Sequence, residues 1–375
     1  MKTPYLETIA NCLQAPLYPD RTGKGRHRQF GGVETYDLTG NVLPADTTNQ
    51  MYLKTLVKEV FAFIKGSNNI KDLGEPFWRS WSPTDKDIEA FIDATIEEHK
   101  KLKDEGAVQF FTSSENREAY KKTLVKHIDT IGPMYGVLWR EFPRVDTRKP
   151  LPWLKGFEDI PSDKVNKYKE MFLADLIRSN QMEKNTKENF EIFCLGMFSQ
   201  SYDQLAKVVA ELKRNPFSSR HRVTAHHPDL VGPEELPPLQ NVLLGYGALS
   251  SCHSFFQFMV TKNEQDEKVL NCMLYMSSSD VMLGRRYNIC QYSLLTIMLA
   301  HCLDFKPGKF TLVSCDTHVY GNHIEDAKIQ VEREPLPYPT IELPVDKKDF
   351  FAFTPEDISI VDYQHHPLIK YEVAV

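Results

Sequence analysis

The spacing of apolar residues predicts three helices. Apolar side chains recur at helical spacing over residues 3–17, and residues 52–65 form an amphipathic segment with a wide apolar face. That segment ends at Gly66, a residue type that favours a helix C-cap. The strongest helical signal lies over residues 287–303, which contain a nearly continuous apolar run.

Alternating or short apolar runs predict strands, most of them in the second half of the chain. Strands and helices interleave without a regular βαβ rhythm, so a mixed sheet is favoured over a doubly wound parallel one. The tail from Phe353 is predicted to be irregular. The predicted strands are residues 30–38, 239–244, 255–261, 269–276 and 310–314.

Two charged stretches interrupt this pattern. Residues 85–130 and 146–213 are rich in lysine and glutamate and have helical periodicity. We interpret both as helical surface insertions on one domain that spans residues 1–375.

Composition narrows the class of protein. Of the 375 residues, 41% are hydrophobic and 26% are charged, which is typical of a soluble globular protein. The net charge of −6 argues against a general nucleic-acid-binding surface, and no apolar run approaches the ~20 residues of a membrane span. The seven cysteines are scattered without a CxxC pair, which favours a reducing compartment. We therefore expect a cytoplasmic location, in the host if the protein is viral.

Cys252 is the first candidate for chemistry. A cysteine attacks electrophiles as a thiolate, which needs nearby positive charge or hydrogen bonds. The alternative is an ordinary buried cysteine. His253 is a poor base for Cys252, because adjacent residues of a strand point to opposite faces.

A second cluster lies at the end of a predicted strand. Asp316, His318 and Tyr320 share one face by the two-residue period, which favours recognition of a hydroxyl group. A zinc site at Cys315, His318 and His323 is the less favoured interpretation, because a second cysteine pair is missing.

Residues 277–288 lead from a predicted strand through Gly284 into a helix. Their hydroxyls and the helix N-terminus could hold an anion, or the serines could simply cap the turn. Glu59 interrupts the apolar face of its helix, and exposure at the edge of that face is the default interpretation. Pairing or functional tuning is the alternative.

Taken in order, these segments resemble the thymidylate synthase family, which includes nucleotide hydroxymethylases. The resemblance covers the chain apart from the two insertions. It is carried by residues 20–25 (DRTGKG), 59–66, Trp78 with Trp81, 132–140 (GPMYGVLWR), 252–258 (CHSFFQF), 280–288 (DVMLGRRYN), 316–323 (DTHVYGNH) and the tail 366–375.

The resemblance implies a three-layer α/β fold on a mixed sheet and a homodimer. It also implies one-carbon transfer to C5 of dUMP, with 5,10-methylenetetrahydrofolate as co-substrate and no metal. No membrane and no nucleic acid are required. Dimerisation would bring Arg220 into the neighbouring subunit's site.

The family implies a role for each matched position. Cys252 would add to C6 of uracil, Glu59 would relay protons at O4, Tyr135 would assist loss of the C5 proton, and Asn288 would bind the uracil edge. The implied substrate-binding residues are Arg21, Arg220, Ser278, His318, Tyr320 and Gln257, and the implied folate-binding residues are Trp78, Trp81, Asp280, Gly284 and Val375.

The sequence lacks two arginines that the family resemblance leads us to expect. Ser219 and Ser277 stand where arginines are expected, and the second of these arginines is expected to support the thiolate of Cys252. Arginines nearby in sequence could compensate, namely Arg222, Arg285 and Arg286.

Two further departures lie close to other matched segments. Ser251 replaces the usual proline before the nucleophile, and Asn49-Gln50 replaces the usual Lys-Arg.

Two products are possible after folate leaves. Hydride transfer gives a methyl group, whereas water gives a hydroxymethyl group. Ser250 and Ser251, the altered phosphate site and the insertions favour a deoxyuridylate hydroxymethylase of phage type. The tryptophans and the Val-Ala-Val tail favour the alternative, a thymidylate synthase that releases dihydrofolate. A non-catalytic binding paralogue is the minor alternative.

Overall fold

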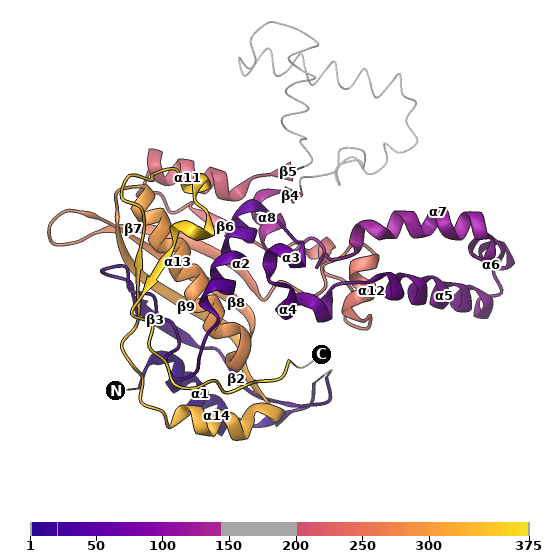
Figure 1. The fold of residues 1–375 in the computed structure, drawn as a ribbon, viewed down its shortest axis with the longest axis horizontal. Helices are drawn as coiled ribbons and strands as arrows, with labels where there is room; N and C mark the ends of the chain where they lie inside the picture. The colour runs from indigo at the N-terminus through magenta and orange to yellow at the C-terminus, as the bar shows by residue number, and fades with distance from the viewer. Residues whose placement is uncertain (1, 21, 144–200, 374–375) are drawn as a thin grey trace, which may run out of the picture. The chain divides into compact units, whose positions relative to one another are not determined.

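The computed structural model of the protein describes residues 2–20, 22–143 and 201–373 (Figure 1). The chain divides into a main unit, Met1–Arg140 with Gln204–Val375, and a second unit, Glu141–Asp203. In the second unit, β4 (Phe142–Pro143) pairs antiparallel with β5 (Ser201–Tyr202). The rest of that unit, and with it most of the predicted insertion over residues 146–213, lies outside the described residues. The single-domain organisation stays a prediction.

The main unit is built on one mixed sheet. Its strand order is β1-β2-β9-β8-β7-β6, and β3 also pairs with β9. β8 and β9 are parallel, whereas the other pairs are antiparallel. The α/β fold on a mixed sheet is thereby confirmed. The strands are β1 (Leu17–Tyr18), β2 (Arg26–Phe30), β3 (Val33–Asp37), β6 (Arg222–Thr224), β7 (His253–Lys262), β8 (Lys268–Asp280) and β9 (Lys306–Tyr320).

The predicted helices are present, and one predicted strand is wrong. Residues 239–243 lie in a helix with Pro238 at its first turn, where the missing N–H of proline costs nothing, and Leu244 is its C-cap. The described helices are α1 (Pro4–Gln14), α2 (Leu53–Lys65), α3 (Ile70–Leu73), α4 (Glu75–Trp78), α5 (Asp85–Lys101), α6 (Glu105–Thr112), α7 (Ser114–Leu124), α8 (Gly136–Arg140), α11 (Gln204–Arg214), α12 (Pro238–Leu243), α13 (Arg286–Cys302) and α14 (Ile324–Val331). A small pair, β10 (Thr340–Glu342) with β11 (Ser359–Val361), lies near the otherwise irregular tail.

Helix α13 forms the centre of the main unit. Every residue from Asn288 to Ala300 is buried, which is expected of a helix that is covered on all sides. It contacts β8 and β9 on one side and α2 on another. Sheet, α13 and α2 therefore form successive layers. α2 ends at Gly66, whose φ of 78° is the left-handed conformation of a C-cap.

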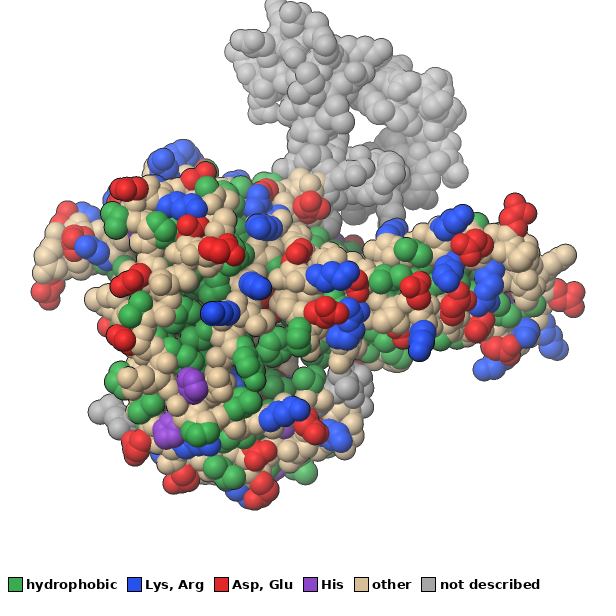
Figure 2. Space-filling model, viewed as in Figure 1, with side chains coloured by type: hydrophobic (Ala, Val, Ile, Leu, Met, Phe, Trp, Pro, Cys, Tyr) green, Lys and Arg blue, Asp and Glu red, His purple; other side chains and the backbone are tan. Residues whose placement is uncertain are grey.

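Helices α5 to α7 form an arm on the main unit (Figure 1). Ile88, Ile92 and Ile96 make a stripe at four-residue spacing that is buried with Leu124 and Leu243. Acidic and basic side chains are mixed over the outside of the arm in Figure 2. The prediction of helices over residues 85–130 agrees with this segment of the structure. Within the described residues, no helix combines the length and apolarity needed to cross a bilayer.

A buried ion pair joins β3 to the start of α13. Arg285 Nε and Glu34 Oε1 are 2.9 Å apart, and both side chains are almost fully buried. Arg285 Nη1 donates to the hydroxyls of Ser279 and Ser314, each at 3.0 Å, and the hydroxyl of Tyr36 donates to Glu34 Oε2 at 2.6 Å. Parts of β3, β8 and β9 are therefore connected through one guanidinium group.

Removing one partner of this pair is expected to be strongly destabilising. Glu34→Gln should lower the free energy of unfolding by about 3 kcal/mol, because the charge of Arg285 would stay buried without its counter-ion. Urea unfolding measures the change, with Glu342→Gln, which alters an exposed residue at the end of β10, as the control. Equal stabilities of the two variants would contradict the importance given to the pair.

Candidate active site

Cys252 is half-buried, directly before β7. Its Sγ lies 3.6 Å from the carbonyl oxygen of Ser250, and its own carbonyl accepts a hydrogen bond from the backbone N–H of Ser277 at 2.9 Å. Burial and the charges of Asp280 and Asp316 raise the pKa of the Cys252 thiol to about 11, although a hydrogen bond with Tyr135 lowers it. In the free protein the thiol is therefore protonated at neutral pH.

Tyr135 lies between the thiol and a buried histidine. Its ring stacks on the ring of His253, with centroids 3.8 Å apart and planes 1° apart. Burial lowers the pKa of His253 to about 3, so its imidazole is neutral. Tyr135 has a φ of 43°, a conformation that is costly for a bulky residue and concentrates at functional sites. The structure thus brings Cys252 and Tyr135 together. His253 is neutral and buried, so it is a poor base for the thiol.

Glu59 is held in a chain of side-chain hydrogen bonds. Trp78 Nε1 donates to Glu59 Oε1 at 2.5 Å, and Gln291 Nε2 donates to Glu59 Oε2. Asn288 Nδ2 then donates to Gln291 Oε1 at 3.0 Å. Burial raises the pKa of Glu59 to about 7, although both hydrogen bonds lower it. The default interpretation of Glu59 as an exposed edge residue is therefore wrong, because the carboxylate is paired and partly withdrawn from water.

This chain of hydrogen bonds orients the amide of Asn288. An ionised carboxylate only accepts, so Gln291 presents its nitrogen to Glu59 and its oxygen to Asn288. Asn288 must then present its nitrogen to Gln291, which leaves Oδ1 free to accept from another group. A Cβ added at Gly284 would lie 3.6 Å from that oxygen, so glycine keeps the adjacent space open. Sequence reasoning missed Gln291, whose only signal is its position one turn after Asn288.

The strand register places a row of polar groups across β2, β9 and β8. His318 lies opposite Arg28 on one side and Asp280 on the other, and Asp316 lies opposite Ser278. His318 Nδ1 is 3.5 Å from Asp316 Oδ1, and the rings of His318 and Tyr320 are 5.1 Å apart. The predicted common face of Asp316, His318 and Tyr320 is confirmed, and their proposed roles stay predictions.

Asp280 begins the turn that leads to Asn288. Its Oδ1 accepts from the backbone N–H groups of Met282 (3.1 Å) and Leu283 (3.3 Å), so it caps a π-helical turn over Val281–Arg285. Asp280 rather than the serines therefore caps this turn, and the anion-binding interpretation of the segment stays a prediction. Wide π-helical turns often occur at functional sites.

Of the two tryptophans predicted to bind folate, Trp78 lies next to Tyr135. The ring of Trp78 is 5.6 Å from that of Trp81 and 6.0 Å from that of Tyr135. In the less favoured zinc interpretation, His323 would be a ligand, and its Nε2 lies 2.7 Å from the carbonyl oxygen of Glu372. The described residues contain no group of three or more His, Cys, Asp or Glu side chains arranged to hold a metal ion.

Two of the arginines expected to compensate for missing cations are occupied elsewhere. Arg285 is bound to Glu34 in the core, and Arg286 Nη1 lies 3.3 Å from Asp46 Oδ2 with both side chains buried. These two predictions are wrong, because buried guanidinium groups with counter-ions are not available to a substrate. Arg222 is exposed on β6, where it pairs in register with Gln257.

Gln257 contacts the loop that carries Arg220. Gln257 Nε2 donates to the carbonyl oxygen of Ser219 at 2.9 Å, and Arg220 is exposed next to it. Gln257 thereby fastens the loop that carries Arg220. Arg21 and Val375 lie outside the described residues.

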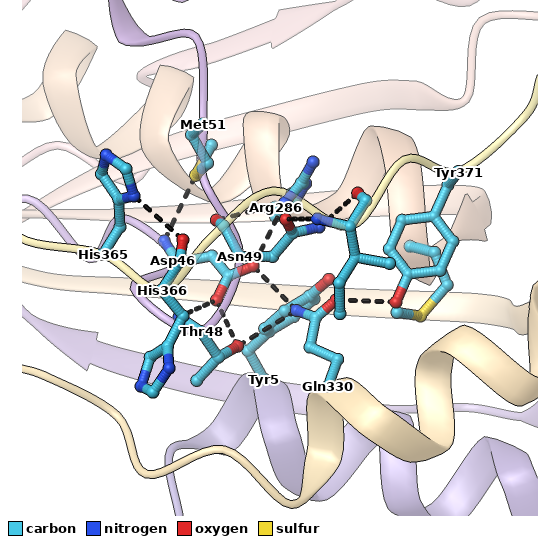
Figure 3. A network of polar contacts seen from close by, with 12 residues as sticks. Tyr5, Asp46, Thr48, Asn49, Met51, Arg286, Gln330, His365, His366 and Tyr371 are labelled. Atoms are coloured by element: carbon cyan, nitrogen blue, oxygen red, sulfur yellow. Dashed lines mark hydrogen bonds and ion pairs between the residues drawn. The ribbon is translucent and has the colours of Figure 1, made fainter.

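The C-terminal tail is tied to the segment before α2 (Figure 3). The Asn49 side chain donates to the carbonyl oxygen of Ile369 at 3.0 Å and accepts from its N–H at 2.7 Å. The hydroxyl of Tyr371 donates to Gln330 Oε1 at 2.8 Å, and Gln330 Nε2 donates to Asp46 Oδ2 at 2.9 Å. Asn49, which departs from the family pattern, thus holds the tail by a backbone-like pair of hydrogen bonds.

Restoring a cation beside Cys252 is expected to activate its thiol. Ser277→Arg should lower the pKa of Cys252 by about one unit or more, because a nearby positive charge favours the thiolate. Alkylation of the Cys252 peptide by iodoacetamide at pH 7, followed by mass spectrometry, should become several-fold faster than in wild type. Ser277→Gln provides a neutral control of similar length, and an equal acceleration in that variant would rule out the electrostatic explanation.

Ionisation of Glu59 is expected to lower stability as pH rises. The pKa of Glu59 is raised from 4.5 to about 7, so the folded state binds more protons than the unfolded state between these values. Relative to Glu59→Gln, the wild type should lose up to about 1.4 kcal/mol per pH unit across that window and then level off. Denaturant unfolding at several pH values checks this, with Glu98→Gln, which alters an exposed residue of α5, as the control. Parallel curves for wild type and Glu59→Gln would disprove the raised pKa.

Comparison with protein families agrees with the fold. The family model described as thymidylate synthase matches residues 3–375, which is essentially the whole chain. The reaction associated with this family is folate-dependent one-carbon transfer to C5 of dUMP, with methylenetetrahydrofolate as co-substrate. The chain is thus a one-carbon transferase that belongs to the thymidylate synthase family.

Proposed function

We propose that the protein transfers a hydroxymethyl group to C5 of dUMP, with 5,10-methylenetetrahydrofolate as the one-carbon donor. The observation that carries this proposal is the grouping of a thiol with an oriented amide. Cys252 contacts Tyr135, while Asn288 is oriented through Gln291 by Glu59. Such a set can hold a uracil ring and attack it.

The first step is addition of the Cys252 sulfur to C6 of uracil. A bond forms between sulfur and C6, the C5–C6 double bond opens, and its electron pair moves through C5 and C4 onto O4. The thiol proton must leave as this bond forms. Glu59, with a pKa of about 7, suits exchange of protons at O4 because both of its states are populated near neutral pH.

C5 then attacks the one-carbon unit of the folate and forms a carbon–carbon bond to it. The C5 proton departs, and the electron pair of the C5–H bond expels tetrahydrofolate by breaking its bond to the one-carbon unit, which leaves an exocyclic methylene on C5. Tyr135 contacts Cys252, so its hydroxyl is the candidate group to assist the departure of the C5 proton. The amide of Asn288 selects the base. Its free Oδ1 can accept from N3–H of uracil, whereas N3 of cytosine carries no hydrogen and would face the oxygen unfavourably.

Capture of the exocyclic methylene by water would give the hydroxymethyl product. Ser251 is buried and precedes the nucleophile, and the Ser250 carbonyl lies 3.6 Å from Sγ, so two polar residues lie beside the attacking atom. Polar groups beside the reacting carbon favour entry of water over a dry hydride transfer. Water adds to the methylene as the Cys252–C6 bond breaks, and one proton of the water is released.

Methylation to dTMP is the second candidate. The paired rings of Trp78 and Trp81 next to Tyr135 supply an apolar wall that would exclude water. In that reaction, hydride from tetrahydrofolate reaches the same methylene, and dihydrofolate is released.

A homodimer formed through the sheet is part of this proposal. Met259, Met273 and Tyr275 are large apolar residues that lie exposed on β7 and β8. Such an apolar sheet face favours association with a second copy. The loop fastened by Gln257 carries Arg220 at the same strands, so it is positioned to reach a neighbouring subunit.

A product assay is expected to separate these functions. Incubation of the full chain with dUMP and methylenetetrahydrofolate should yield a nucleotide whose mass corresponds to 5-hydroxymethyl-dUMP, without the absorbance rise of dihydrofolate. A dTMP product with dihydrofolate would establish methylation instead. Cys252→Ser, which preserves size and polarity, should abolish either product.

A binding paralogue without catalysis is tested with 5-fluoro-dUMP. In the presence of methylenetetrahydrofolate, the wild type should form a covalent complex that survives denaturation and maps to Cys252. The fluorine at C5 cannot leave as a proton does, so the adduct persists. A complex that never becomes covalent, even at saturating nucleotide, would overturn the catalytic proposal.

A further inference from the structure

Three donor side chains converge on the carboxylate of Asp316. Arg26 Nη1 donates to Oδ2 at 3.3 Å, and Arg28 Nε donates to Oδ1 at 3.0 Å. The hydroxyl of Ser278 donates to Oδ2 at 3.3 Å, so Ser278 and Arg26 share one acceptor oxygen. His318 Nδ1 lies 3.5 Å from Oδ1. Asp316 therefore gathers donors from β2, β8 and β9 into one cluster.

The cluster carries more positive charge and more donors than Asp316 satisfies. Two guanidinium groups face one carboxylate, and the buried Nε of Arg26 has no hydrogen-bond partner among the described residues. The Arg28 side chain is 42% exposed, and its guanidinium carbon lies 5.9 Å from the centre of the Tyr18 ring. These arginines are held in place and still accessible to a ligand.

We infer that Arg26 and Arg28, together with Ser278, bind the 5′-phosphate of the nucleotide substrate. This inference rests on the proposed function and identifies the cations that replace the arginines missing at Ser219 and Ser277. A phosphate monoester dianion matches paired guanidinium groups, which offer it several parallel N–H donors.

The register of β2 against β9 supports this assignment. Arg28 pairs with His318 and Arg26 pairs with Tyr320. These two partners belong to the face that is predicted to recognise a hydroxyl group, which on dUMP is the hydroxyl of the deoxyribose. The phosphate is attached to the same sugar, so it must lie within a few bonds of them. Arg285 and Arg286 cannot take this role, since both are buried in ion pairs with Glu34 and Asp46.

Calorimetric binding of dUMP and of deoxyuridine to the full chain tests the assignment. Arg26→Gln and Arg28→Gln should each weaken dUMP binding about tenfold or more, because each removes a charge-assisted contact to phosphate. Binding of deoxyuridine, which has no phosphate, should not change. Arg214→Gln, which alters an exposed arginine at the end of α11, is the matched control and should leave both affinities unchanged.

Three results would separate the possible failures. Wild type that binds dUMP in preference to deoxyuridine, with the same preference in both glutamine variants, would overturn this inference and leave the proposed function intact. A loss confined to folate affinity would also overturn it, by assigning the cluster to the carboxylates of the co-substrate. Wild type that binds no dUMP would overturn the proposed function itself.

Lysine variants, which retain the positive charge, keep the test valid if the glutamine variants are unstable. If a glutamine variant unfolds at a lower temperature than wild type, Arg26→Lys and Arg28→Lys replace it. Lysine keeps the charge but loses the planar fork, so the preference for dUMP over deoxyuridine should fall partially. A preference that is unchanged in folded lysine variants would again contradict phosphate binding.

Discussion

The buried guanidinium of Arg285 is the contact on which the arrangement of the site depends. It binds Glu34 on β3, Ser279 on β8 and Ser314 on β9, and it lies one residue before α13 begins. A one-residue slip between strands would turn their side chains to the opposite face. By contacting three strands at once, Arg285 favours the register that places Asp280 beside His318. The same contact fixes where α13 starts, and with it the position of Asn288.

Much of the fold could be predicted from local pattern. Helix α13 and strands β7 to β9 have long apolar or alternating runs, so their type is unambiguous. The prediction of a strand over residues 239–244 was wrong, because the periodicity of a short apolar run does not distinguish a strand from a helix. Pro238 was the available signal, and it lies at the first helical position of α12.

Residues of the candidate site could be predicted only where the signal lies within one contiguous segment of the sequence. Cys252 and the face shared by His318 and Tyr320 were chosen from contiguous residues, and Asn288 was chosen from the resemblance of residues 280–288 to a segment of the family. Gln291 and the pair Arg26 and Arg28 could not be found in this way, since their roles come from partners more than two hundred residues distant in sequence. For the same reason, Arg285 and Arg286 looked available until Glu34 and Asp46 were seen to neutralise them.

The protonated state of Cys252 constrains how the nucleophile can work. Carboxylates rather than guanidinium groups dominate its surroundings, so the thiolate is scarce in the free protein. A thiol of higher pKa is nevertheless more nucleophilic once ionised, with a Brønsted coefficient of about 0.4–0.5. That gain offsets only part of the lost thiolate population. Addition to C6 is therefore expected to depend on proton loss that accompanies the attack, and the site must supply a proton acceptor in reach of sulfur. The groups at O4 of a bound uracil meet that requirement. Tyr135 does not, because burial raises its pKa well above the usual range and its hydroxyl favours the thiolate by donating to it, and burial lowers the pKa of His253 too far for it to act as the base.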